Sequence, residues 1–281
     1  MTTESDGGTV GDDGAAGGGS SAPRTTATML RAAVTEIRRD PWLLCPFAVA
    51  GLLVALVDWL RQRDPISVVT PHWMDQTVSL QYSVFPRGTA RTSRSVGALV
   101  DLELPSLLGA VALEAVVPLA VGTAGWVTMT RVLDRDSGRA SLGRYLAALA
   151  SLTVTLRLFA PVRFSPDSVP LILLSLVVLS LVLVSLFALP GYLAAGYGVL
   201  HALGASAATA RGQRLQLFGL VLTFGLAAWG LARVPVAGGF LSTAVVAPVQ
   251  AVSIAVLVRG ADTDGCRRLP SRPRDGVRSI W

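Results

Sequence analysis

The sequence contains no lysine and no asparagine, so all 24 of its basic side chains are arginines. A phosphate-binding P-loop needs a lysine and N-glycosylation needs an asparagine, so both are excluded. Charged residues are also scarce, at 15% of the 281 residues, whereas soluble domains carry about 25%. The two cysteines, Cys45 and Cys266, fall in an apolar segment and in a polar tail, so we expect no disulfide between them. The composition therefore disfavours a soluble nucleotide-binding or disulfide-stabilised domain.

What the sequence has instead is long apolar runs. Residues 168–190 (SVPLILLSLVVLSLVLVSLFALP) form a stretch of 23 residues without one charged side chain. A helix of that length crosses a hydrocarbon layer of about 30 Å. The mean hydropathy of the whole chain is +0.57, which indicates that its main solvent is lipid. We therefore expect an integral membrane protein.

Residues 25–258 are predicted to form a membrane domain with six apolar segments long enough to be spans. The predicted spans are 41–60, 105–131, 145–162, 168–190, 215–232 and 237–258. Trp42 and Trp59 lie near the two ends of the first span, where interfacial aromatic side chains belong. Pro118 and Pro248 predict kinks in the second and sixth spans. The fold class predicted is all-α, a polytopic bundle of about six transmembrane helices.

The segments outside these spans have distinct compositions. Residues 1–24 are rich in glycine, serine, threonine and acids, which predicts a disordered tail. Residues 25–40 predict an amphipathic helix at the membrane interface, with an apolar face of Met29, Leu30, Ala33, Val34 and Ile37. Residues 77–84 alternate between polar and apolar side chains and precede a Pro-Arg-Gly turn, which predicts a β-hairpin or a small outward cap. Residues 259–281 predict a basic tail.

The arginines are distributed unevenly between the two sides that six spans define. Sixteen lie near the termini or in the loops on the same side, seven lie on the opposite side, and Arg157 lies within a span. Basic loops remain cytoplasmic, so we expect a cell-membrane protein with both termini in the cytoplasm. This asymmetry also explains the net charge of +6, and we expect no nucleic acid partner. The expected partners are the lipid bilayer and other membrane proteins.

Two charged residues inside predicted spans, Glu114 and Arg157, are the main candidates for a functional site within the membrane. At about 1.5 Å per residue, both lie roughly 10–13 Å below the outer surface, and antiparallel neighbouring spans would place them side by side. A charge at the centre of a membrane helix costs about 2.5–3.5 kcal/mol, so each needs a partner or a wet cavity. They could form a substrate or proton site or a structural ion pair, or Arg157 could extend towards the interface. Asp58, nearer the outer surface, could join them or be interfacial.

No other residues form a convincing catalytic or ligand-binding pattern. His72 and His201 lack a second ligand at metal-binding spacing, and the turn ADTDG, with Asp262 and Asp264, is better explained by solvation than by a metal. Gly204-Ala205-Ser206 lacks the second glycine and the strand of a nucleophile elbow. We therefore expect no enzyme activity, no cofactor and no metal.

Two stretches carry a resemblance to a known group of proteins. They are RRDPWLLCPFAVAGLL and YGVLHALGASAATARGQRLQLFGLVL, in which Gly198, Ala202, Leu203 and Ser206 match a Gly-x-x-x-Ala-Leu-x-x-Ser-like segment before the fifth span. The chain thus resembles six-span uncharacterised membrane proteins of haloarchaea. These are in turn loosely similar to the membrane domain that accompanies some glycerophosphodiester phosphodiesterases. The usual basic residue beside the Ala-Leu pair is absent. The resemblance implies a fold and an archaeal source but no activity.

The function expected from these observations is that of a non-enzymatic scaffold, assembly or regulatory protein of the cell envelope. The alternative is a small-solute transporter that uses Glu114 and Arg157 within the bundle. The proline kinks in the second and sixth spans also motivate this alternative, and internal symmetry between the two halves of the chain would favour it.

Overall fold

The computed structural model describes residues 25–63, 83–87, 104–135, 138–159, 169–234 and 237–268. Every regular element in these ranges is helical, and five helices are long and apolar enough to cross a membrane. Those five are Pro41–Arg63, Leu104–Leu133, Val177–Ala194, Arg214–Ala232 and Gly238–Asp262. The all-α membrane architecture predicted from the apolar runs is confirmed.

The N-terminal helix α1 (Thr26–Arg39) forms where the amphipathic pattern predicted it. The Thr25 hydroxyl caps its first turn by accepting a hydrogen bond from the Thr28 amide, and Arg38 and Arg39 complement the negative end of the helix. Met29 and Ala33 are buried against the bundle, whereas Val34 is 39% exposed. The helix rests on α10 (Ala247–Arg268) and on the start of α8 (Arg214–Ala232). Its position at a lipid interface stays a prediction.

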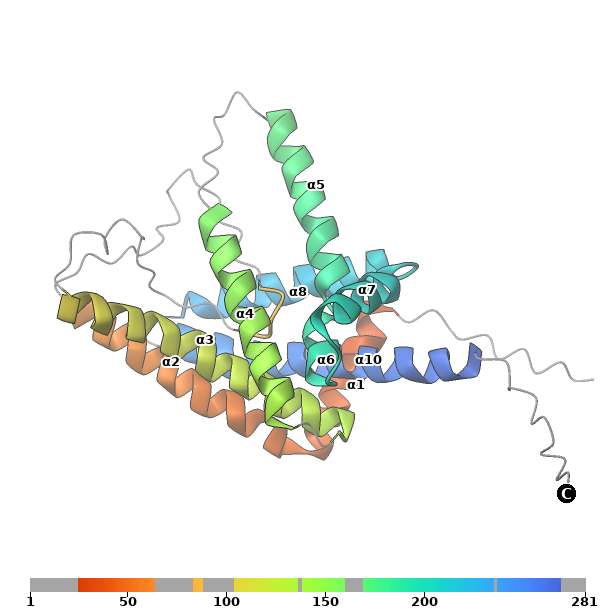
Figure 1. Cartoon of the computed structure of the whole chain (residues 1–281), viewed down its shortest axis with the longest axis horizontal. Helices are drawn as coiled ribbons and strands as arrows, with labels where there is room; N and C mark the ends of the chain where they lie inside the picture. The colour runs from red at the N-terminus through yellow and green to blue at the C-terminus, as the bar shows by residue number, and fades with distance from the viewer. Residues whose placement is uncertain are drawn as a thin grey trace, which may run out of the picture.

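Helix α3 (Leu104–Leu133) packs against both α2 (Cys45–Arg63) and α10, and these three helices contribute much of the core (Figure 1). A short 3₁₀ turn, η1 (Pro41–Leu44), connects α1 to α2, and the Asp40 carboxylate caps it by accepting from the Trp42 amide. The start of α8, the end of α3 and the second half of α10 all lie beside α1 or η1. Since α2 begins directly after η1, the four long helices α2, α3, α8 and α10 alternate in direction, as the predicted order of spans requires.

The proline positions produce two different outcomes. Helix α3 continues through Pro118 for 30 residues. Pro248 instead follows a π-helical turn, η4 (Ser242–Val246), which separates α9 (Gly238–Leu241) from α10. Proline has no amide hydrogen and its ring clashes with the carbonyl four residues earlier, so the normal α-helical ladder is interrupted before Pro248.

The span predicted at residues 168–190 is two helices rather than one. Helix α5 (Val169–Leu186) ends at a turn, and α6 (Leu189–Ala194) begins with Pro190 in its first turn, where a missing amide hydrogen is harmless. The chain thus stays helical beyond Pro190, the residue at which the sequence predicted an end. Helix α7 (Val199–Ala210) then packs on α5, and the Ser206 hydroxyl donates to the Ser185 carbonyl at 2.7 Å.

Residues 83–87 differ from the predicted outward hairpin. They form no strand, and Val84, Phe85 and Pro86 are buried. The Phe85 ring meets the Tyr145 ring edge-on at 5.1 Å between centroids, and the Gln250 side chain donates to the Ser83 carbonyl at 3.3 Å. These five residues therefore pack inside the helix bundle, while the other residues of the predicted cap lie outside the described part of the chain.

Helix α4 (Arg139–Phe159) overlaps the predicted span 145–162 but is not among the five candidate spans. Figure 1 shows that α4 and α5 rise steeply from the layer formed by α2, α3 and α10. Tyr145 and Leu149 anchor α4 in the core. The sixth span stays a prediction.

Matching Trp–Arg pairs end α2 and α8. The Arg63 guanidinium lies 3.9 Å from the Trp59 ring centroid, and Arg233 lies 3.9 Å from the Trp229 ring. Both pairs have the same four-residue spacing, which places cation and ring on one helix face. Exposed tryptophan and arginine at a helix end are typical of a membrane–water interface.

Candidate functional site

The candidate site is a buried cluster of charges between α2 and α3. The Arg61 guanidinium lies between two carboxylates, with Nη2 2.8 Å from Glu114 Oε1 and Nη1 3.6 Å from Asp58 Oδ1. The exposed fractions of the three side chains are 3% for Arg61, 9% for Asp58 and 13% for Glu114. One guanidinium thus pairs with an acid of its own helix and, across the contact between the two helices, with an acid of α3.

The helices position this cluster by their spacing. Asp58 and Arg61 are three residues apart on α2, so they share one face. Glu114 lies in α3, 17 residues before Arg131 and ten residues after Leu104. At about 1.5 Å per residue, Glu114 is roughly 26 Å along α3 from Arg131 and 15 Å from Leu104, the first residue of the helix. Glu114 therefore lies well inside its candidate span, whereas Asp58 and Arg61 lie in the last two turns of α2.

The structure brings together two of the three predicted site residues and adds one that the sequence analysis missed. Glu114 and Asp58 meet through Arg61, which was assigned to the outer loop because it follows the apolar run directly. The signal that could have found it is the Asp-x-x-Arg spacing, which aligns two opposite charges on one helix face. Arg157 lies in α4, but its side chain is outside the described part of the structure, so its pairing with Glu114 stays a prediction.

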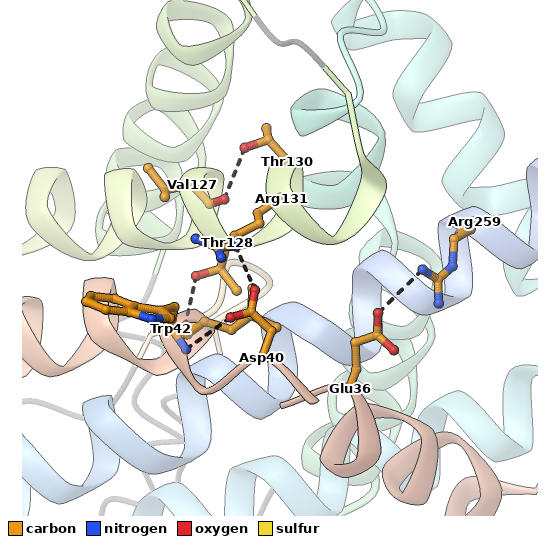
Figure 2. A network of polar contacts seen from close by, with 9 residues as sticks. Glu36, Asp40, Trp42, Val127, Thr128, Thr130, Arg131 and Arg259 are labelled. Atoms are coloured by element: carbon orange, nitrogen blue, oxygen red, sulfur yellow. Dashed lines mark hydrogen bonds and ion pairs between the residues drawn. The ribbon is translucent and has the colours of Figure 1, made fainter. Parts of the chain in front are cut away.

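A second polar network lies at the opposite end of the same helices (Figure 2). Arg131 Nε lies 2.7 Å from Asp40 Oδ2, and the Thr128 hydroxyl donates to the Leu43 carbonyl at 3.3 Å. On α1, Glu36 Oε1 lies 3.6 Å from Arg259 Nη1 of α10. Figure 2 shows these contacts joining α1, α3 and α10 around the start of α2. The register of α2 against α3 is therefore fixed by charged contacts near both ends.

The interior of the bundle holds further polar groups. Gln250 on α10 is 3% exposed and reaches residue 83, while Ser242 and Thr243 of the π-helical turn are buried at 0% and 1%. The Thr243 hydroxyl donates back to the Gly239 carbonyl at 2.8 Å. The Tyr145 hydroxyl is buried and has no hydrogen-bond partner within the described ranges. Phe85 packs on the Tyr145 ring, and Val84 and Phe85 both belong to the apolar core.

His201 and Asp262, the described residues considered above as metal ligands, contact other side chains. His201 is exposed, and its ring stacks on the Tyr197 ring at 5.1 Å between centroids. Asp262, which the sequence placed in a solvated turn, lies in α10 and accepts from Arg135 Nη2 at 2.9 Å. A search of the described residues finds no group of three histidine, cysteine or acidic side chains that could hold a metal ion.

Comparison with known proteins adds no functional information: no family model, curated protein or solved structure matches the chain.

Proposed function

We propose that this protein is a non-enzymatic integral membrane protein that acts as a scaffold or assembly partner in the cell membrane. The observation that supports the proposal is the charge cluster of Asp58, Arg61 and Glu114, whose ion pairs join α2 to α3. The arginine bridges an acid of its own helix and an acid of α3, and Asp40, just before η1, pairs with Arg131 of α3 near the other end of the same contact. This arrangement serves to fix helix packing.

The packing of residues 83–87 supports the same proposal. Val84 and Phe85 are 1% and 2% exposed and belong to the continuous apolar core. They occupy the region beside Gln250, where a solute pathway would need polar, accessible walls. Apolar side chains of α5 and α8, among them Val177 and Leu226, are more than half exposed and are available to lipid or to other membrane proteins. The cytoplasmic position of both termini and the resemblance to haloarchaeal six-span proteins remain part of this proposal.

Replacing the charge cluster by apolar side chains tests the scaffold role. The triple variant Asp58→Leu, Arg61→Met and Glu114→Met removes all three charges and keeps apolar volume between the helices. A scaffold whose cluster is structural keeps its function once it folds, so the variant should complement a deletion strain. The paired measurement is the amount of folded protein in detergent. A triple variant that folds at the normal yield and fails to complement contradicts the proposal.

The second candidate function is transport of a small solute or ion, and the π-helical turn at Ser242–Val246 favours it. Discontinuous helices and π-turns recur at the binding sites of transporters and other functional proteins. The buried Ser242 and Thr243 hydroxyls lie on this turn, against α2 and α8. Substituting Thr243 by valine keeps the volume and removes the hydroxyl. Transport through this region is favoured if Thr243→Val folds normally but fails to complement the deletion strain. The triple cluster variant should then still complement it.

A further inference from the structure

A cleft of about 450 Å³ opens where the chain leaves α3 and enters α4, beside the end of α6. Its walls include Asp134, Arg135, Gly138, Ser141, Arg144 and Gly196. A Cβ atom added to either glycine would meet nothing within 4 Å, so both glycines face open space. The cleft is thus accessible, and its polar lining consists of backbone, two arginines, one acid and Ser141.

The level of the cleft follows from the spans that lead into it. Leu133 is the last residue of the candidate span Leu104–Leu133, and Ala194 is the last residue of Val177–Ala194. Asp134 and Ala195, the residues that directly follow, both line the cleft. A site that begins where two apolar spans end lies at the boundary of the hydrocarbon layer, which is the depth of lipid headgroups.

The two arginines of the cleft differ in how their charge is matched. Arg135 is held in place because Nη1 donates to the Ala195 carbonyl at 3.0 Å and Nη2 lies 2.9 Å from Asp262 Oδ2. Arg144 is exposed, and its Nε donates to the Ala140 carbonyl at 3.3 Å. Among the described side chains, no acid lies within ion-pair distance of Arg144. Arg144 therefore presents a cation to the cleft that an anion would complement.

Two further features act on an anion in this cleft, in opposite directions. The positive end of the 21-residue helix α4 adjoins it and attracts negative charge. Asp134, at the rim, repels it. Asp134 has a left-handed backbone conformation with φ of 49°, which asparagine adopts as readily as aspartate. Its charge can therefore be removed without changing the backbone that shapes the cleft.

We propose that this cleft binds the phosphate group of an anionic phospholipid headgroup. Arg144 supplies the charge that pairs with the phosphate, and Arg135, fixed by Asp262 and Ala195, forms the wall beside it. The acyl chains of the lipid would extend along the apolar spans that end at the cleft. Basic sites between membrane helices at the headgroup level recognise lipid phosphates in this way.

The test measures the affinity of the full-length protein in detergent for a fluorescent phosphatidylglycerol, with phosphatidylcholine as the reference lipid. Arg144→Gln should weaken phosphatidylglycerol binding about fivefold, and Asp134→Asn should strengthen it about fivefold, since one charge near the lipid surface changes affinity by about that factor. The matched control is Arg211→Gln, because Arg211 is exposed, follows α7 and does not line the cleft. Its affinity should change less than twofold.

Equal losses in Arg144→Gln and Arg211→Gln would overturn the proposal, because they would show general surface attraction rather than binding in the cleft. Unchanged affinity in both Arg144→Gln and Asp134→Asn would also overturn it. Inorganic phosphate is tested in the same assay. If it binds with the same dependence on Arg144 while the protein shows no preference for phosphatidylglycerol over phosphatidylcholine, the cleft takes a soluble phosphate and the lipid assignment is wrong.

Discussion

Arg61 and Glu114 meet across the α2–α3 contact with 2.8 Å between Nη2 and Oε1, and both side chains are almost fully buried. Removing one member of a buried pair leaves the other charge without compensation, which typically costs about 3–5 kcal/mol. Arg61→Met should be the most destabilising single change within the cluster, because it leaves Asp58 and Glu114 as neighbouring acids without the arginine that joins them. Thermal unfolding in detergent measures the loss.

The exposed pair of Asp40 and Arg131 provides the control for this prediction. Its side chains are 33% and 55% exposed, and an ion pair so accessible to solvent contributes about 0–1 kcal/mol. Arg131→Met should therefore lower the unfolding temperature much less than Arg61→Met. The double variant Arg61→Met with Glu114→Met should recover part of the loss. A similar effect at the two arginines would show that burial does not control the strength of the Arg61 cluster.

Phe85 fixes residues 83–87 inside the bundle, and its removal should destabilise the whole molecule. The side chain is 2% exposed and packs edge-on against Tyr145. Truncation of a buried phenylalanine to alanine typically costs about 3–5 kcal/mol, since a cavity remains. The control is Val154→Ala on α4, where the side chain is 56% exposed. If Phe85→Ala unfolds at the temperature of Val154→Ala, residues 83–87 do not contribute to the core.

The helical architecture could be predicted from the sequence because lipid imposes a simple requirement. Every backbone polar group must be satisfied within the span, so an uncharged run such as residues 168–190 has to be helical. The amphipathic spacing from Met29 to Ile37 predicted α1 for a similar reason. The inward packing of Phe85 could not be predicted, because alternating apolar residues indicate a buried face without indicating which surface buries it.

The charge cluster was only partly predictable. A charged residue inside an apolar run, such as Glu114, is recognised at once because it needs a partner. The identity of that partner depends on how far α2 slides along α3, and this register follows from three-dimensional packing rather than from either helix alone. Arg61 lies at the end of its apolar run and looked interfacial for that reason. The break between α5 and α6 before Pro190 was missed because proline was interpreted as a terminator rather than as a residue of the first turn.

Gly191 permits the close approach of α6 and α10, and its replacement by alanine should be costly. A Cβ atom at this position would lie 2.8 Å from a methyl group of Ile254 and 2.8 Å from a methyl group of Val258. Both neighbours are β-branched and move little, so the helices must separate. At Gly109 on α3, an added Cβ meets nothing within 4 Å. Gly109→Ala should therefore be neutral or stabilise the helix by up to about 1 kcal/mol. If Gly191→Ala and Gly109→Ala unfold at the same temperature, the close α6–α10 contact is contradicted.

The Tyr145 hydroxyl is buried and lacks a hydrogen-bond partner among the described residues, so its contribution to stability can be tested. Tyr145→Phe removes the hydroxyl and keeps the ring that packs on Phe85. Because no described hydrogen bond is lost and a buried polar group disappears, the variant should be as stable as the original or more stable by about 1–2 kcal/mol. Calorimetry or thermal unfolding in detergent gives the comparison. A loss of stability would show that the hydroxyl binds an ordered water or another group.

The orientation in the membrane can be tested with single cysteines on opposite sides of the bundle. Leu200 on α7 is 85% exposed and lies on the side proposed to be cytoplasmic, whereas Arg233 is exposed beyond the other end of α8. Each position is changed to cysteine in a chain in which Cys45 and Cys266 are replaced by alanine. A membrane-impermeant maleimide added to intact cells should label Arg233→Cys and leave Leu200→Cys unlabelled until the cells are lysed, because basic loops remain in the cytoplasm. The reverse pattern would place the arginine-rich ends outside, and labelling of both positions in intact cells would show that the two residues do not lie on opposite sides of the membrane.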